Sequence, residues 1–131
     1  MNPVIPDNPL ARFCWFDLAA VDAHRAADFY AGMFGWRTQR QAANGGEFFR
    51  FAHNGVAIAS LYQLQARQVE AGVPSHWTPY VGVSDVGAMA AKAATLGGSV
   101  VVKPFQVNDV ARVGLVTDSA GALIGLWELP Q

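Results

Sequence analysis

One carboxylate stands in an otherwise apolar segment near the start of the chain. Asp17 lies within residues 13–20, FCWFDLAA, between aromatic and aliphatic neighbours. Burial of an ionised carboxylate costs free energy unless the group has a partner, and burial raises its pKa. Asp17 is therefore a candidate general base, with Tyr80 or His76 as the second member of an acid–base pair. It is equally a candidate anchor for a cationic or hydroxyl group of a ligand.

The reactive side chains of this segment also have structural interpretations. Asp17 can instead accept hydrogen bonds from backbone groups or from an arginine, for which the candidates are Arg12, Arg50 and Arg112. Cys14 is the one cysteine of the chain, and its apolar neighbours favour a small buried side chain over a nucleophile. A single cysteine also excludes an internal disulfide and suits a reducing compartment.

The composition is typical of a well-buried globular protein. Of the 131 residues, 52% are hydrophobic and only 15% are charged, which argues against disorder. The net charge of −1 and the absence of a basic run predict no nucleic-acid surface. No apolar run approaches the roughly 20 residues of a membrane span, and the first 12 residues lack the apolar core of a signal peptide. We therefore expect a cytoplasmic protein that contacts neither nucleic acid nor membrane.

The candidate residues Asp17, Tyr80 and His76 lie within a sequence pattern that occurs twice, about 63 residues apart. Each copy starts with a strand-like segment, continues through an aspartate into an apolar-periodic helix, and ends that helix at glycine. Asp22 and Asp85 are the expected caps of helices over 22–33 and 85–96. Asn-Gly steps and other turn signals then separate three further β-like segments in each copy.

The resulting prediction is the order βαβββ, written twice within one domain spanning 1–131. The expected strands are 12–18, 36–41, 47–52, 56–64, 77–83, 99–106, 112–117 and 122–129. Module one covers about 12–64, a polar linker covers about 65–75, and module two covers about 76–129.

The motifs of both copies resemble the vicinal oxygen chelate superfamily, which includes glyoxalase I, extradiol dioxygenases and bleomycin-binding resistance proteins. The residues that carry the resemblance are Asp22, Phe29, Tyr30, Phe34, Gly35 and Trp36, the run from Val81 to Gly98, and residues 118–127. The resemblance implies an α+β fold of two tandem βαβββ modules, with curled mixed sheets around a cleft and helices outside. It also implies a homodimer, since small members commonly complete their clefts across a two-fold axis.

Enzymes of that superfamily usually bind a divalent metal through His or Glu on the first and last strands of each module. Carried over by spacing, these positions fall at Trp15, Ala59, Thr78 and Gly125. An indole, a methyl group and a bare Cα bind no metal, and one hydroxyl is a poor ligand. Among the neighbouring residues only Cys14 is a credible ligand. We therefore expect no metal and no other cofactor.

Strand alternation then predicts which side chains line the cleft. Phe16 and Leu18 are expected under the helices, while Val81 and Val83 are expected to pack outward. The expected ligand-binding residues are Phe13, Trp15, Asp17, Ala59, Leu61, Thr78, Tyr80, Leu123, Gly125 and Trp127. Large aromatic rings beside small residues suit a planar or apolar ligand.

Three functions follow as hypotheses. The first is a metal-free protein that binds a planar or apolar small molecule in an aromatic cleft, for which the bleomycin-binding branch is the precedent. The second is a metal-independent lyase, isomerase or hydrolase that acts on a small metabolite and uses Asp17 as general base. The third is a metal-dependent enzyme that takes ligands from the second subunit of a dimer.

Overall fold

The computed structural model describes residues 9–43, 46–107 and 109–130, and these form two compact units. Unit one spans Phe16–Trp77, and unit two joins the preceding residues up to Trp15 to the chain from Thr78 onward. The first half of the chain contains β1 (Phe13–Ala20), α1 (Ala23–Phe34), β2 (Arg37–Ala43), β3 (Gly46–His53), β4 (Val56–Gln63) and α2 (Ala66–Glu70). The second half contains β5 (His76–Val83), α3 (Val86–Thr95), β6 (Ser99–Val107), β7 (Ala111–Thr117) and β8 (Leu123–Glu128).

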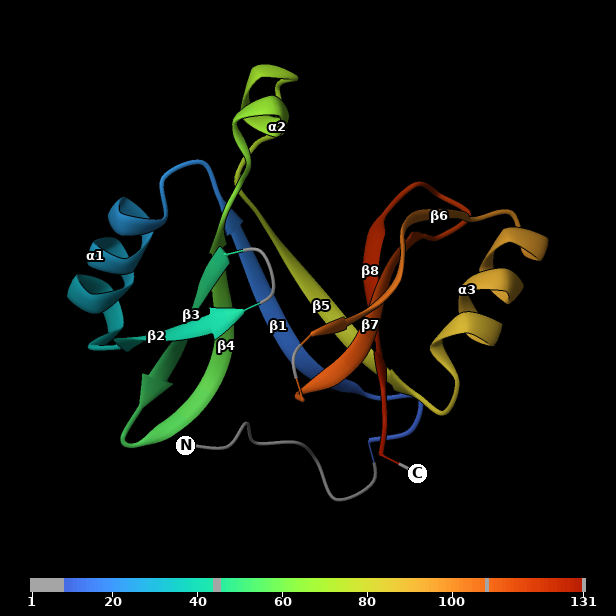
Figure 1. The fold of residues 1–131 in the computed structure, drawn as a ribbon, viewed down its shortest axis with the longest axis horizontal. Helices are drawn as coiled ribbons and strands as arrows, with labels where there is room; N and C mark the ends of the chain where they lie inside the picture. Colours follow the sequence, from blue (N-terminus) through green and yellow to red (C-terminus); the bar gives the residue numbers. More distant parts are fainter. Residues whose placement is uncertain (1–8, 44–45, 108, 131) are drawn as a thin grey trace. The chain divides into compact units, whose positions relative to one another are not determined.

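Unit one is a mixed sheet with α1 against one face (Figure 1). β2 and β3 are antiparallel, β3 and β4 are antiparallel, and β4 runs parallel to β1. The core between sheet and helix contains Leu18, Phe51 and Leu61, and Ala23 of α1 belongs to the same cluster. Burial of these apolar side chains fixes which face of the sheet α1 covers.

Unit two repeats this arrangement with α3 in the place of α1 (Figure 1). β5 runs parallel to β8, and β8, β7 and β6 follow as antiparallel neighbours. Val83, Val116 and Leu126 of the sheet form a core cluster with Val86 and Ala90 of α3. Each unit therefore has the βαβββ order with a mixed sheet, and the predicted α+β class is confirmed. The prediction that the chain is a single domain stays a prediction.

The helices α1 and α3 begin with the same two kinds of cap. Asp22 accepts a hydrogen bond from the Arg25 backbone N–H at 3.1 Å, and Asp85 accepts one from Ala88 at 2.9 Å. Such caps satisfy backbone donors that have no partner inside the helix.

The second cap comes from the last strand of each copy. The Ala23 N–H donates to Gln63 Oε1 at 2.8 Å, and the Val86 N–H donates to Glu128 Oε2 at 2.9 Å. Gln63 and Glu128 thus have the same role, which the sequence pattern of the two copies does not reveal.

The predicted linker over 65–75 contains a short helix that the sequence did not indicate, α2, whose first turn has the Gln65 N–H donating to Gln68 Oε1 at 2.8 Å. One local prediction is wrong. Phe16 was expected under the helices, yet it is about half exposed while Leu18 is buried beneath α1. Among the helices of the described residues, none has the length and apolar character needed to cross a bilayer.

Candidate functional site

The strand registers within each unit show which positions of the two copies are equivalent. Asp17 and Tyr80 each stand five residues before the aspartate that caps the following helix. Asp17 pairs with Ser60 on β4, and Tyr80 pairs with Gly125 on β8. Ser60 is therefore the counterpart of Gly125, and the following residues on the same face, Tyr62 and Trp127, correspond as well.

This register corrects two predicted site residues. Ala59 and Leu61 were expected to line a cleft, but both belong to the core cluster that packs against α1. Side chains of directly paired residues point to the same face of a sheet, and Leu61 pairs with Leu18, which is also in that cluster. The prediction was wrong by one residue, and a one-residue shift moves every side chain of a strand to the other face.

The face of unit one opposite α1 carries a polar row across its four strands. Asp17 on β1 pairs with Ser60 on β4, Ser60 pairs with Arg50 on β3, and Arg50 pairs with Gln39 on β2. Asp17, Ser60 and Arg50 are each half-buried, and each has an interaction partner within the fold. Asp17 therefore lies in the same row as Arg50, one of the arginines expected as its structural partner. The row is also where Asp17 would contact a ligand.

Tyr62 lies beside this row and was not singled out by the sequence. It is two residues after Ser60 on β4 and therefore on the same face. Burial and the negative charge of Asp17 raise the pKa of Tyr62 from its ordinary value of 10.0 to about 12. The phenol consequently stays protonated at physiological pH and can donate a hydrogen bond.

The equivalent face of unit two is aromatic instead of polar. The ring of Trp127 lies 5.9 Å from that of Trp15 in a tilted arrangement and 6.2 Å from that of Tyr80 in an edge-to-face arrangement, both measured between centroids. All three side chains are buried. Aromatic pairs at such distances and angles are favourable beyond the area that they bury. Trp127 thus joins Trp15 and Tyr80 in one group, here called the aromatic cluster; the prediction that these rings line a ligand cleft stays a prediction.

The other predicted site residues have varied surroundings. Thr78 is buried and Leu123 is half-buried, while Phe13 is 56% exposed. His76 is half-buried, and its Nδ1 donates to the Pro74 carbonyl at 2.8 Å, since a carbonyl oxygen only accepts. Cys14 is buried, and burial raises the pKa of its thiol to about 11, as expected of a structural cysteine. Whether these residues bind a ligand stays a prediction.

The side chains at the metal positions of unit two do not fit a metal ion. Trp15 offers only an indole, and Thr78 offers one hydroxyl. Gly125 has no side chain, and a Cβ built there would collide with the ring of Tyr80. The Tyr80 ring therefore occupies the space into which a metal-ligating side chain at residue 125 would extend. Over residues 9–43, 46–107 and 109–130, no group of three or more His, Cys, Asp or Glu side chains is arranged to hold a metal.

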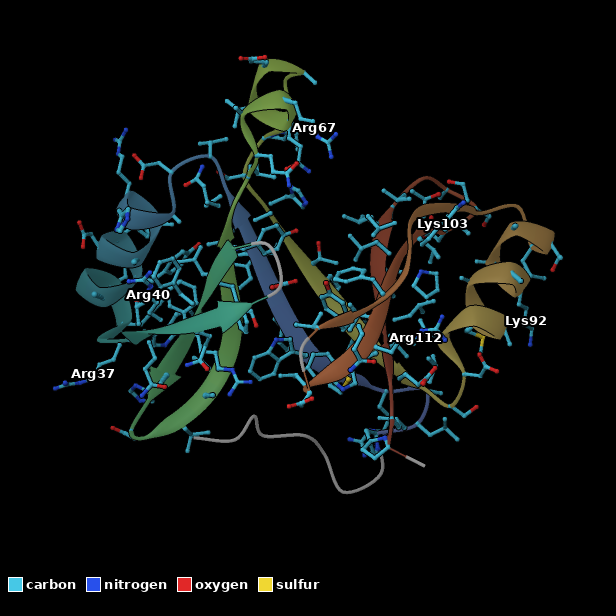
Figure 2. The ribbon with its side chains drawn as sticks, viewed as in Figure 1. Arg37, Arg40, Arg67, Lys92, Lys103 and Arg112 are labelled. Atoms are coloured by element: carbon cyan, nitrogen blue, oxygen red, sulfur yellow. The ribbon has the colours of Figure 1, made fainter. Side chains whose placement is uncertain are left out.

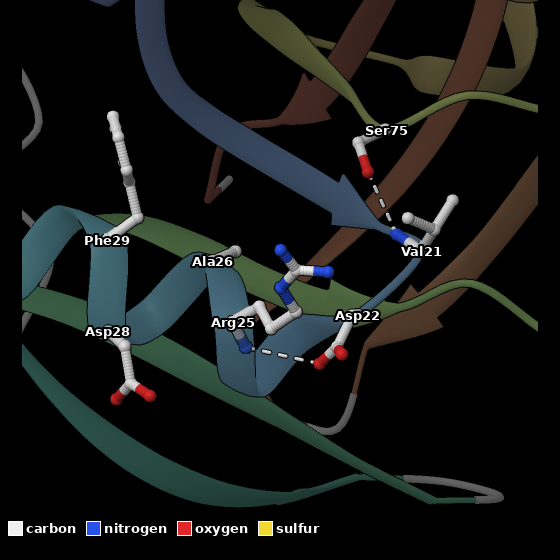
Figure 3. Close-up of a pocket in the computed structure, with 7 residues that line it drawn as sticks. All are labelled: Val21, Asp22, Arg25, Ala26, Asp28, Phe29 and Ser75. Atoms are coloured by element: carbon white, nitrogen blue, oxygen red, sulfur yellow. Dashed lines mark hydrogen bonds between the residues drawn. The ribbon is translucent and has the colours of Figure 1, made fainter.

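A shallow depression of about 640 Å³ lies at the start of α1 and is distinct from both faces (Figure 3). Two of its polar side chains, those of Asp22 and Ser75, have partners within the fold. Asp22 caps the Arg25 N–H, and Ser75 Oγ accepts a hydrogen bond from the Val21 N–H at 2.9 Å (Figure 3).

Comparison with known sequences places this geometry in a family. Residues 12–126 match the model of the glyoxalase/bleomycin resistance protein/dioxygenase superfamily. A Mycobacterium tuberculosis protein named "Putative glyoxylase CFP32" is 34% identical over 116 residues, which is 87% of this chain and 44% of that protein. The anthracycline biosynthesis protein DnrV of Streptomyces peucetius is 31% identical over 124 residues, or 86% of this chain and 45% of that protein. The chain thus spans about half the length of these relatives.

Solved structures show the same fold at lower sequence identity. Methylmalonyl-CoA epimerase from Mycobacterium tuberculosis superposes with a TM-score of 0.65 at 18% identity, covering 98% of this chain and 94% of the epimerase. The Streptomyces coelicolor epimerase gives 0.61 at 20% identity, covering 93% and 99%. With its two βαβββ units and a family match along nearly its whole length, the chain belongs to the glyoxalase/bleomycin resistance protein/dioxygenase superfamily.

Proposed function

We propose that the chain is a small-molecule-binding protein of the glyoxalase/bleomycin-resistance type that holds a planar or apolar ligand without a metal ion. The observation that carries this proposal is the aromatic cluster of unit two. In that cluster Trp15 stands at a predicted metal position, and Tyr80 covers Gly125, which is another. Aromatic rings recognise planar ligands through stacking and edge contacts.

The names of the relatives support a planar ligand. Two relatives, DnrV of Streptomyces peucetius and DauV of a further Streptomyces strain, are named anthracycline biosynthesis proteins. Anthracyclines contain fused planar rings, so they are a reasonable probe for this chain. Because the three rings of the cluster are buried, ligand binding has to displace the side chains that cover them, and the environment of Trp15 and Trp127 must change.

The test is a titration of the purified protein with daunorubicin, an anthracycline, followed by tryptophan fluorescence with and without EDTA. We expect saturable quenching with the same Kd in both buffers. Metal analysis of the same sample should find no stoichiometric zinc, nickel, iron or manganese. Binding that requires an added divalent metal, or metal that remains bound through purification, would overturn the proposal.

A metal-independent enzyme is the second candidate, and the polar row of unit one favours it. Asp17 supplies a carboxylate on a half-buried sheet face, and Tyr62 supplies a phenol that stays protonated. A base and a neutral hydrogen-bond donor are the minimum set for proton transfer at carbon or oxygen. We test this by NMR in deuterium oxide with a library of small metabolites. New products or deuterium incorporation that disappear in Asp17→Asn would favour the enzyme, and a silent library would favour the binding protein.

We also propose that two copies associate through the outer face of α1. Phe29, Met33 and Phe34 are each more than half exposed on this helix, and the neighbouring Trp77 is 39% exposed. Exposed apolar side chains grouped on one surface commonly mark an interface. The relatives are about twice as long as this chain, so a second copy is a suitable occupant for this surface. Sedimentation should give a dimer at micromolar concentration, and Met33→Glu should give a monomer.

A further inference from the structure

The polar face of unit one has a composition that suits one chemical class of ligand. We infer that Arg50, Ser60 and Tyr62 form a binding site for the carboxylate group of a small molecule, with Asp17 as the charge that holds Arg50 in place. This inference rests on the proposed function and deepens it, because it names a chemical class of small molecule that unit one would bind. The three donors and Asp17 come from β1, β3 and β4 of the same unit.

The register places these groups within reach of one another. Arg50 and Asp17 both pair with Ser60, so they lie on either side of it in one row. Adjacent strands are about 4.8 Å apart, which puts the Cα atoms of Arg50 and Asp17 at roughly 10 Å across β4. An arginine side chain spans more than half that distance. Arg50 is therefore long enough to extend across Ser60 toward the Asp17 carboxylate, and a guanidinium has more N–H groups than one carboxylate engages.

The hydrogen-bonding capacity of the row favours an anion over a cation. Arg50 contributes several N–H donors, and the hydroxyls of Ser60 and Tyr62 contribute one each. Asp17 is the one acceptor with a formal charge in this set. Its negative charge also disfavours ionisation of Tyr62, which keeps the phenol as a donor. A planar carboxylate matches the guanidinium fork of arginine and forms charge-assisted hydrogen bonds with it.

The equivalent face of unit two cannot bind such a group. Tyr80, Gly125 and Trp127 replace Asp17, Ser60 and Tyr62, and Leu115 replaces Arg50, as the pairing of Leu115 with Gly125 shows. The two copies thus share a scaffold while their faces differ in polarity.

The experiment uses salicylate, a planar carboxylate, and salicylamide, its neutral amide, as probes. Each is titrated into 15N-labelled protein, and the amide shifts in β1, β3 and β4 are followed by NMR. The variants are Arg50→Gln and the matched control Arg40→Gln, which removes an arginine from the neighbouring β2. Arg40 pairs with Phe49, which packs against the α1 core, so it belongs to the other face; Figure 2 shows its place beside α1.

Salicylate should bind more tightly than salicylamide to the unmodified protein. Arg50→Gln should weaken salicylate binding roughly tenfold or more, because hydrogen bonds to charged groups are the stronger class. The same variant should leave salicylamide binding unchanged, and Arg40→Gln should change neither. Tyr62→Phe keeps the ring and removes only the hydroxyl, so it provides a second variant if Arg50→Gln folds poorly; it should weaken salicylate binding severalfold.

The outcomes separate this inference from the proposed function. Equal affinity for the two probes, equal effects of Arg50→Gln and Arg40→Gln, or no shift in β1, β3 and β4 would overturn the carboxylate site while metal-free binding of daunorubicin stands. Salicylate binding that appears only with an added divalent metal would overturn the proposed function. In that case the contrast between the Arg50 and Arg40 variants still decides whether Arg50 contacts the carboxylate.

Discussion

Replacement of Trp15 by alanine tests whether the aromatic cluster is core, binding site or both. Trp15 is 3% exposed, so the change removes a fully buried indole and its contact with Trp127. Truncation of a buried Phe or Trp to Ala costs about 3–5 kcal/mol. For a chain of this size we expect a fall in Tm of about 10–20 °C. Urea unfolding followed by far-ultraviolet circular dichroism measures the loss without depending on tryptophan emission.

The matched control for this variant is Phe13→Ala. Phe13 lies two residues before Trp15 on the same strand but is 56% exposed, so its truncation should cost less than about 1 kcal/mol. If the two variants lose similar stability, Trp15 is not the buried core residue described here.

Binding of daunorubicin to Trp15→Ala is then measured well below its Tm. The lost ring contact alone corresponds to about 0.5–1.5 kcal/mol, and lost burial adds about 1.5–3 kcal/mol. We therefore expect affinity to fall at least tenfold, since 1.4 kcal/mol is about a decade. A large loss of stability with unchanged affinity would show that the ring is core alone and that the ligand binds elsewhere.

The further predictions concern three side chains, those of Tyr62, Cys14 and Glu128. Ultraviolet titration should show Tyr62 ionising near pH 12, and Asp17→Asn should lower that pKa, though burial keeps it above 10; ionisation of Tyr62 at its ordinary pKa would contradict its burial. The pKa of Tyr62 is higher in the folded than in the unfolded protein, so Tyr62 contributes stability that is fully present below pH 10 and lost as pH rises toward 12. Urea unfolding at a series of alkaline pH values should show this loss of stability, and Tyr62→Phe should remove it. Cys14 should react slowly with a disulfide reagent at pH 8 in folded protein and rapidly in urea, because burial raises its pKa to about 11. Glu128→Ala should lower the free energy of unfolding by about 1–2 kcal/mol, whereas Glu128→Gln should cost less, since Gln63 fills the same role at α1.

The fold was predictable because its main signals are local and occur twice. Helices were expected over 22–33 and 85–96, and the structure has α1 at Ala23–Phe34 and α3 at Val86–Thr95. The aspartate before each helix and the glycine after it identify both ends from sequence alone. The short helix α2 was missed because it has no apolar periodicity, and its first turn depends on a contact between two glutamines.

The site was only partly predictable because strand register decides which face a residue occupies. In β4 the sequence VAIASLYQ is apolar or small at nearly every position, so either set of alternate residues can form the core. The register also shifts between Phe51 and Ala52, where β3 and β4 pair irregularly. In β8 the pattern was less ambiguous, and Leu126 does face α3 while Trp127 joins the aromatic cluster. Tyr62 was missed for the same reason as Ser60, since both stand on the face that the prediction assigned to the core.

The caps supplied by Gln63 and Glu128 bear on the order in which the chain folds. Each reaches back to the first turn of its helix across about 40 residues of sequence, from Gln63 to Ala23 and from Glu128 to Val86. The first turn is the costly step of helix formation, and closing a loop of this length has an entropic cost of its own. The amides of Ala23 and Val86 therefore become protected only when the last strand of the same copy has docked. Pulsed hydrogen exchange during refolding therefore measures, at each of these two amides, the time at which its βαβββ copy is complete. The two copies can be completed at different rates.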